Sequence, residues 1–198
     1  MGESSDLKKQ MEFLAEIDKL KNIFRQSLLT TDQRRENDAE HSWHLCMYAT
    51  VLSDYAPEGC NMLRCIQMML VHDIVEIYAG DTYLYDEEGY KTKKKRESEA
   101  ADKIYSMLPE SQEVFLKGLW TEFEENTTPT ANFANTLDRL QPIMLNYYSR
   151  GEKWLVNKVT KEQVFSKWKT VARSVSNEIE SFLENLLDEC VEKGYLLP

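Results

Sequence analysis

The sequence predicts an all-α fold made of one domain. Apolar residues recur at helical spacing along the chain, and no segment shows the alternating pattern that predicts a β-strand. The 7 Gly and 5 Pro residues fall mostly between the expected helices, where such residues commonly mark helix ends. A length of 198 residues is typical of one domain with a core large enough to fold unaided. No repeat or linker suggests a division, so we expect residues 1–198 to form one domain.

The first expected helix is amphipathic, and its apolar residues recur at helical spacing, or one step from it, at Leu7, Met11, Leu14, Ile17 and Leu20. The stretch over residues 26–37 is polar and predicts a loop. Asn37 or Asp38 can cap a second helix, which would run to about residue 55. Pro57 and Gly59 follow and would break this helix.

The middle of the chain predicts three more helices. Asn61 can cap a helix that continues through the segment MLRCIQMMLVHDIVEIYA and ends at Gly80. A polar loop is expected over residues 81–92, followed by helices over about residues 93–107 and 109–125.

The C-terminal part predicts three further helices. Thr128-Pro129 can start one of them, because proline at the first helical position loses no hydrogen bond. Two more helices are expected after Thr160 and after Ser174, and Gly194 would end the last. We expect these C-terminal helices, residues 160–194, to pack on the preceding core.

Charge and composition restrict the classes of partner. With 24 basic and 34 acidic residues, the net charge is −10, which disfavours nucleic-acid polymers and anionic membranes. A single nucleotide remains possible, because a local cationic pocket can bind it. No apolar run approaches the length that spans a bilayer. The four Cys residues lack CxxC spacing and the N-terminus lacks an apolar signal region, so we expect reduced thiols in a cytoplasmic protein.

The residues with the clearest chemical meaning are His41, the dipeptide His72-Asp73, and Asp138. The chain contains only 3 His residues, and two of them fall into this pattern. Imidazole and carboxylate ligands bind divalent cations such as Mn, Co, Mg, Fe or Zn. Two of each would leave coordination positions open for water or substrate, as a hydrolytic metal site requires.

The surroundings of the two aspartates favour a metal site over ordinary packing. Taken alone, each residue is more often a packed histidine or a surface carboxylate. Asp73, however, lies in MMLVHDIVEIYA and Asp138 lies in ANTLDRLQPIML, where a carboxylate is costly unless it is paired or bound to a cation. Pro142 cannot donate a hydrogen bond to the Asp138 carbonyl, so a kink is expected there. His44 is expected to pack or to support the ligands.

The strings RRENDAEHSWH, HDIVEIYAGDT and LWTEFEENTTPTANFANTLDRLQP resemble the HD-domain metal-dependent phosphohydrolases, in particular their 5′-deoxynucleotidase-like branch. The resemblance covers about residues 10–150. It implies a compact helical bundle around a central metal ion, which His41, His72, Asp73 and Asp138 would bind. The branch also pairs commonly as a homodimer, and 4 Trp and 10 Tyr residues suit an interface.

The same resemblance implies roles for three more residues. Glu76 and Asp81 match the acidic residues that transfer protons and orient water, and Arg25 matches a phosphate-binding arginine. Gln26 stands where the characterised bacterial members carry an aromatic residue that excludes ribose. We therefore expect only a weak preference for deoxyribose.

The leading hypothesis is a hydrolase that removes the 5′-phosphate from (deoxy)nucleoside monophosphates by attack of a metal-bound water. Asp81 would accept the proton of that water, Glu76 would orient it or assist the leaving group, and Arg25 would hold the phosphate. The alternatives are a nucleoside di- or triphosphate hydrolase of the same superfamily and a non-catalytic metal-binding interaction protein. The basic run Lys93–Arg96 is expected to form a solvated helix face rather than to steer substrate. Either Arg34 or Arg35 could reach the pocket.

Overall fold

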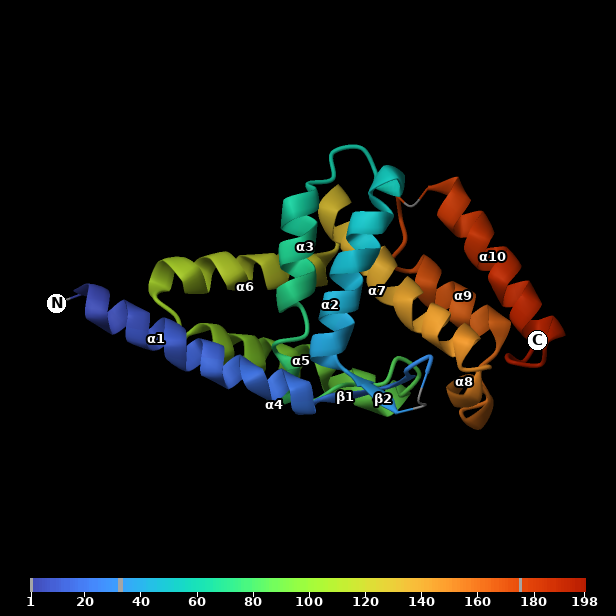
Figure 1. The fold of residues 1–198 in the computed structure, drawn as a ribbon, viewed down its shortest axis with the longest axis horizontal. Helices are drawn as coiled ribbons and strands as arrows, with labels where there is room; N and C mark the ends of the chain where they lie inside the picture. Colours follow the sequence, from blue (N-terminus) through green and yellow to red (C-terminus); the bar gives the residue numbers. More distant parts are fainter. Residues whose placement is uncertain (1, 32–33, 175) are drawn as a thin grey trace.

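The computed structural model describes residues 2–31, 34–174 and 176–198, and it is built almost entirely of helices. Three helices form the centre of the molecule (Figure 1): α2 (Asp38–Val51), α3 (Met62–Val71) and α7 (Pro129–Tyr148). On one side lie α1 (Gly2–Glu16), the 3₁₀ helix η1 (Ile17–Asn22), α4 (Glu76–Ala79), α5 (Glu87–Tyr105) and α6 (Glu110–Glu125). On the other side lie α8 (Glu152–Val156), α9 (Lys161–Lys169) and α10 (Asn177–Glu192), and a short 3₁₀ helix, η2 (Ser53–Tyr55), follows α2.

Several helix starts follow the predicted caps. The Asn37 side chain accepts a hydrogen bond from the Glu40 backbone N–H, and the Glu40 side chain accepts one from the Asn37 backbone N–H. Asn61 caps α3 by accepting from Arg64 N at 3.0 Å. Thr128 caps α7 with a proline at its first turn, and Thr160 caps α9. These caps are confirmed because each depends only on residues within the same turn.

The loop expected over residues 26–37 is wrong in part, because a small antiparallel hairpin occupies this region. Strand β1 (Phe24–Leu28) pairs with β2 (Arg35–Asn37), with Phe24 opposite Asn37 and Leu28 opposite Arg35. Both strands are too short and polar to show alternation. The pairing is stabilised by packing against α7 and α8, which the local sequence does not reveal.

Three other boundaries also differ from the prediction. The helix expected to continue to Gly80 is interrupted between α3 and α4, over residues 72–75. Helix α5 begins at Glu87 rather than at residue 93, because Asp86 caps it by accepting from Gly89 N at 3.0 Å. The short helix α8 was not predicted.

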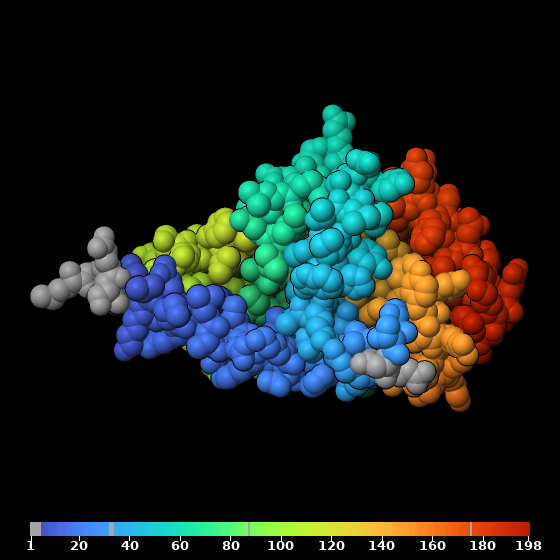
Figure 2. Space-filling view, in the orientation of Figure 1, coloured from blue at the N-terminus to red at the C-terminus, as the bar shows by residue number. Residues whose placement is uncertain are grey.

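The apolar stripe of the first helix does not face the core. Leu7, Met11 and Leu14 are 60%, 58% and 55% exposed, whereas Phe13 is buried. Figure 2 shows α1 along one edge of the molecule, where it has few neighbours to cover this face. The helix forms as predicted, but its position decides which side chains are buried.

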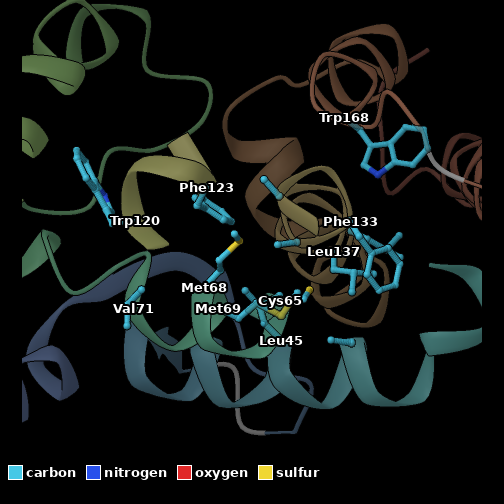
Figure 3. Packing of buried hydrophobic residues seen from close by; sticks show 14 of the residues in the cluster. Leu45, Cys65, Met68, Met69, Val71, Trp120, Phe123, Phe133, Leu137 and Trp168 are labelled. Carbon is cyan, nitrogen blue, oxygen red and sulfur yellow. The ribbon is translucent and has the colours of Figure 1, made fainter. Parts of the chain in front are cut away.

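The central core lies where α2, α3, α6 and α7 pack together. Figure 3 shows Leu45, Cys65 and Met69 meeting between α2 and α3, with Phe133 and Leu137 of α7 close by. Trp120, Phe123 and Trp154 are buried in the core. This packing brings the polar segments of α2, α7 and the interruption after α3 to one point.

Candidate metal centre and adjoining cavity

Three elements bring the four expected ligands together. His41 lies early in α2, His72 and Asp73 lie at the interruption after α3, and Asp138 lies in the middle of α7. His41 Nε2 is 3.0 Å from Asp138 Oδ1 and 3.8 Å from Asp73 Oδ2. His72 Nε2 is 3.0 Å from Asp73 Oδ2 and 3.7 Å from Asp138 Oδ1. All four side chains are buried.

The interruption after α3 allows two adjacent residues to face one centre. In a regular helix, neighbouring side chains point about 100° apart. Here the backbone forms 3₁₀-type hydrogen bonds, from Ile74 N to Val71 O at 3.2 Å and from Glu76 N to Asp73 O at 2.9 Å. One donor atom each from His41, His72 and Asp73 then lies within 4.8 Å of the others. A single cation could therefore contact all three.

The outer nitrogens of both imidazoles are held by hydrogen bonds. His72 Nδ1 donates to Met69 O at 2.9 Å, so Nε2 faces the cluster, where it is buried without a well-formed hydrogen bond. His41 Nδ1 donates to Gln141 Oε1 at 3.0 Å. Such bonds fix the ring orientation and the tautomer that a metal ligand needs.

Gln141 connects these imidazoles to a second layer of polar groups. Its amide donates to Glu36 Oε1 at 2.7 Å and lies 3.1 Å from His44 Nδ1. His44 therefore lies beside the Gln141 amide that supports His41, in agreement with its expected supporting place. Nothing in the local sequence marked Gln141, because its role depends on residues about a hundred positions away.

The Arg25 side chain contacts the histidine–aspartate cluster through Asp73. Its Nη1 is 2.7 Å from Asp73 Oδ2 and 3.3 Å from Asp38 Oδ1, and its Nε is 4.0 Å from Glu36 Oε2. Asp38 and Glu36 are 0% and 1% exposed, and both were missed as site residues. An acidic residue at a helix start usually serves the helix terminus, and this ordinary explanation concealed the burial of Asp38.

The surroundings raise the pKa of both expected catalytic carboxyls, Glu76 and Asp81. Burial and the neighbouring Asp73 and Asp38 carboxylates hold the pKa of Glu76 well above its ordinary value. Burial also raises the pKa of Asp81. Glu76 thus favours its protonated form, which can donate a hydrogen bond. The two carboxyls therefore differ in what they can do chemically.

Burial and nearby charges also shift the pKa values of His41 and His72. Burial, with Arg25 nearby, lowers the pKa of His41 to about 4 and keeps this imidazole neutral, as metal ligation requires. Burial opposes protonation of His72, but the carboxylates of Asp73 and Asp138 outweigh it and raise its pKa to about 10. A divalent cation would take the place of that proton.

A cavity of about 80 Å³ adjoins the cluster. Its lining includes Arg25 and Asp81 from the expected site, and Gln26 lines it where the resemblance implied an aromatic residue. The full lining is Arg25, Gln26, Ser27, Asp81, Thr82, Tyr83, Leu84, Tyr85, Arg139, Pro142, Ile143, Asn146, Lys153, Trp154, Val164 and Trp168. Arg139 and Lys153 were not singled out from the sequence.

The other basic residues mostly have structural partners. Lys93 pairs with Glu97 Oε1 at 2.7 Å. Arg96 donates to the Ala79 carbonyl and to Thr82 Oγ1, the latter at 2.8 Å, and thereby ties down the segment that carries Asp81. Arg34 pairs with Glu40, and Arg35 donates to the Arg25 carbonyl. Neither Arg34 nor Arg35 is among the residues that line the cavity.

The helical fold and the buried histidine–aspartate cluster point to one class of protein, and comparison with known proteins identifies that class. A family model described as the HD domain matches residues 17–180. The chain belongs to the HD-domain family.

Several known proteins are similar to this chain. A human protein named 5′-deoxynucleotidase HDDC2 is 31% identical over 135 residues, which cover 68% of this chain. The match spans only 65% of that relative's length. A structure described as a predicted metal-dependent phosphohydrolase from Magnetospirillum magnetotacticum is 43% identical, with a TM-score of 0.94 and coverage of 100% and 99% of the two chains. The PH0347 protein from Pyrococcus horikoshii, 22% identical with a TM-score of 0.62 over 92% of this chain and 99% of its own, supports the fold alone.

Within the described residues, no helix combines the length and apolarity needed to cross a membrane.

Proposed function

We propose that this protein is a metal-dependent phosphohydrolase that removes the 5′-phosphate from nucleoside monophosphates. The observation that carries the proposal is a buried cluster of two imidazoles and two carboxylates beside a cavity that Arg25 and Asp81 line. The names of the similar proteins support the same activity and the preference for deoxynucleotides.

The donor set fits a divalent cation. His41, His72, Asp73 and Asp138 would bind it, and the buried Nε2 of His72, which lacks a well-formed hydrogen bond, is the kind of atom that a cation satisfies. When bound, the cation supplies Lewis acidity, which polarises the phosphate and lowers the pKa of a water molecule. We propose Mn, Co, Mg, Fe or Zn, because the donor set suits several of these ions.

The remaining residues would bind substrate and transfer protons. Asp81, at the cavity wall, would accept a proton from the attacking water. Glu76, whose pKa is raised by burial and by the Asp73 and Asp38 carboxylates, would in its protonated form donate a hydrogen bond to the water or to the leaving oxygen. Arg25 would bind phosphate oxygens through its guanidinium group, which matches their geometry.

A substrate panel tests the proposal directly. Deoxy- and ribonucleoside mono-, di- and triphosphates are assayed with Mn, Co, Mg and Zn after chelator treatment. We expect monophosphates to have the highest kcat/KM and deoxyribose to be favoured by at most ~10²-fold. No hydrolysis of any nucleotide with any metal would overturn the proposal and favour the non-catalytic binding protein.

Hydrolysis of di- or triphosphates is the second candidate, and one observation favours it. Arg139 and Lys153 line the cavity together with Arg25, so more than one cation is available to bind additional phosphates. Faster cleavage of triphosphates than of monophosphates in the same panel would decide for this candidate.

We further propose a single HD domain that forms a homodimer in the cytoplasm. One contiguous core with residues from Phe13 to Leu196 supports the single domain. The four unpaired cysteines suit a reducing compartment. Light scattering should give about twice the 23.2 kDa chain mass, and a monomer at micromolar concentration would contradict the dimer.

A further inference from the structure

Arg139 lines the cavity without a direct ion pair to any of the described residues. It follows Asp138 in α7 and lines the cavity together with Arg25. Among the described residues, no carboxylate lies within the 4.0 Å that defines an ion pair with its guanidinium group. Its Nε is buried without a hydrogen-bond partner, and the groups that favour its charge are the Asp138 carboxylate, beyond ion-pair distance, and the Tyr90 side chain.

Other enclosed cations in this protein differ from Arg139. Arg25 lies 2.7 Å from an Asp73 oxygen, and Lys93 lies 2.7 Å from a Glu97 oxygen. A charge withdrawn from water is costly unless a partner of opposite sign compensates it. An anion in the cavity would supply the partner that Arg139 lacks.

The position of Arg139 along α7 fits such an anion. Arg139, Pro142, Ile143 and Asn146 all line the cavity, and their spacing places them on one face of the helix. Seven residues of helix span roughly 10 Å, so the Arg139 end adjoins the ligand Asp138 and the Asn146 end lies farther away. The Arg139 end of this face is therefore the end nearer in the helix to the proposed ligand Asp138.

We propose that Arg139 binds the substrate phosphate as a second guanidinium group, alongside Arg25. The identity of the anion rests on the proposed function. The location rests on the cavity, the unpartnered Nε and the missing carboxylate. Arg25 also makes ion pairs with Asp73 and Asp38, whereas Arg139 makes no ion pair with the described residues and could form one with the phosphate.

The test measures binding of inorganic phosphate to the metal-loaded protein by calorimetry, without any turnover. Arg139→Gln should weaken phosphate binding by roughly 10- to 100-fold, since hydrogen bonds between charged groups contribute that much to affinity. Arg139→Lys keeps the positive charge but loses the planar guanidinium group, so its phosphate affinity should lie between those of the wild type and Arg139→Gln. The control is Arg150→Gln, which removes the same charge from an exposed position just beyond α7 and should change binding by less than about twofold.

Thermal unfolding of the metal-free proteins separates this role from a structural one. Arg139→Gln should melt no lower than the wild type, because it removes a charge that makes no direct ion pair with the described residues. Wild-type phosphate affinity in Arg139→Gln would overturn the inference. It would also be overturned if Arg139→Lys melted at a lower temperature than the wild type but bound phosphate with unchanged affinity.

The phosphate-binding test and the substrate panel can fail independently of each other. If no nucleotide is hydrolysed but phosphate binding still depends on Arg139, the proposed activity fails and the anion site stands. If monophosphates are hydrolysed and phosphate affinity does not depend on Arg139, the activity stands and the anion site fails.

Discussion

At the residue scale, the site depends on imidazole nitrogens that face a common centre. His72 donates through Nδ1 to a backbone carbonyl and presents a buried Nε2 to Asp73 and Asp138. We expect His72→Ala to abolish metal binding and activity together. The measurement is metal content by elemental analysis after dialysis, with His44→Ala as the control that keeps its metal. Full metal occupancy in His72→Ala would remove this residue from the ligand set.

The two proposed catalytic carboxyls should be separable from metal binding. Glu76→Gln and Asp81→Asn conserve shape while removing the acid–base function, and neither residue belongs to the proposed ligand set. We expect both variants to retain metal and to lose ~10²–10⁴-fold in kcat, the usual contribution of a general acid or base. Near-normal turnover in both would exclude them from the mechanism.

The pH dependence should report the ionisation of Asp81. Burial raises the pKa of this carboxyl above its ordinary value, and a base must be unprotonated to accept a proton. The rate should therefore be full above the raised pKa and fall as the pH drops through it, tenfold per pH unit. In Asp81→Asn the residual rate should lose this acid limb. The same limb in both proteins would assign it to another group.

At the element scale, the junction between α7 and α8 is tightly packed against the C-terminal segment. Gly151 has a φ of +69°, and a Cβ atom there would lie 1.8 Å from the Tyr195 carbonyl oxygen. We expect Gly151→Ala to destabilise the protein by roughly 2–4 kcal/mol, through left-handed backbone strain and overpacking. The control is Gly118→Ala within α6, where no heavy atom lies within 4 Å and stability should rise by about 0.5–1 kcal/mol. Urea unfolding midpoints measure both, and equal midpoints would refute the clash.

At the scale of the whole molecule, the metal should hold the bundle together. Its proposed ligands come from α2, from the interruption after α3 and from α7, so a bound ion connects the three central helices. A ligand that binds only the folded state adds about 2.7 kcal/mol at a concentration of 100 Kd. We expect the melting temperature of the chelator-treated protein to rise on adding Mn, and His72→Ala to show no such rise. An equal rise in His72→Ala would place the stabilising ion elsewhere.

The amino-acid sequence by itself determined the helical class and most helix starts. Asn61 and Thr160 form their caps within one turn, so neighbouring residues suffice to predict them. The resemblance to the HD family also named His41, His72, Asp73 and Asp138, because the motifs that carry these residues are distinctive as strings.

Only the tertiary structure decided which groups are enclosed and which remain unpaired. The burial of Asp38, the link through Gln141 and the buried Arg139 Nε without a hydrogen-bond partner among the described residues all depend on elements that are distant in sequence. The apolar residues of α1 show the same limit, since helical periodicity predicts a stripe but not whether a neighbour covers it. Local hydrogen bonds follow from adjacent residues, whereas burial and charge pairing follow from packing of the whole chain.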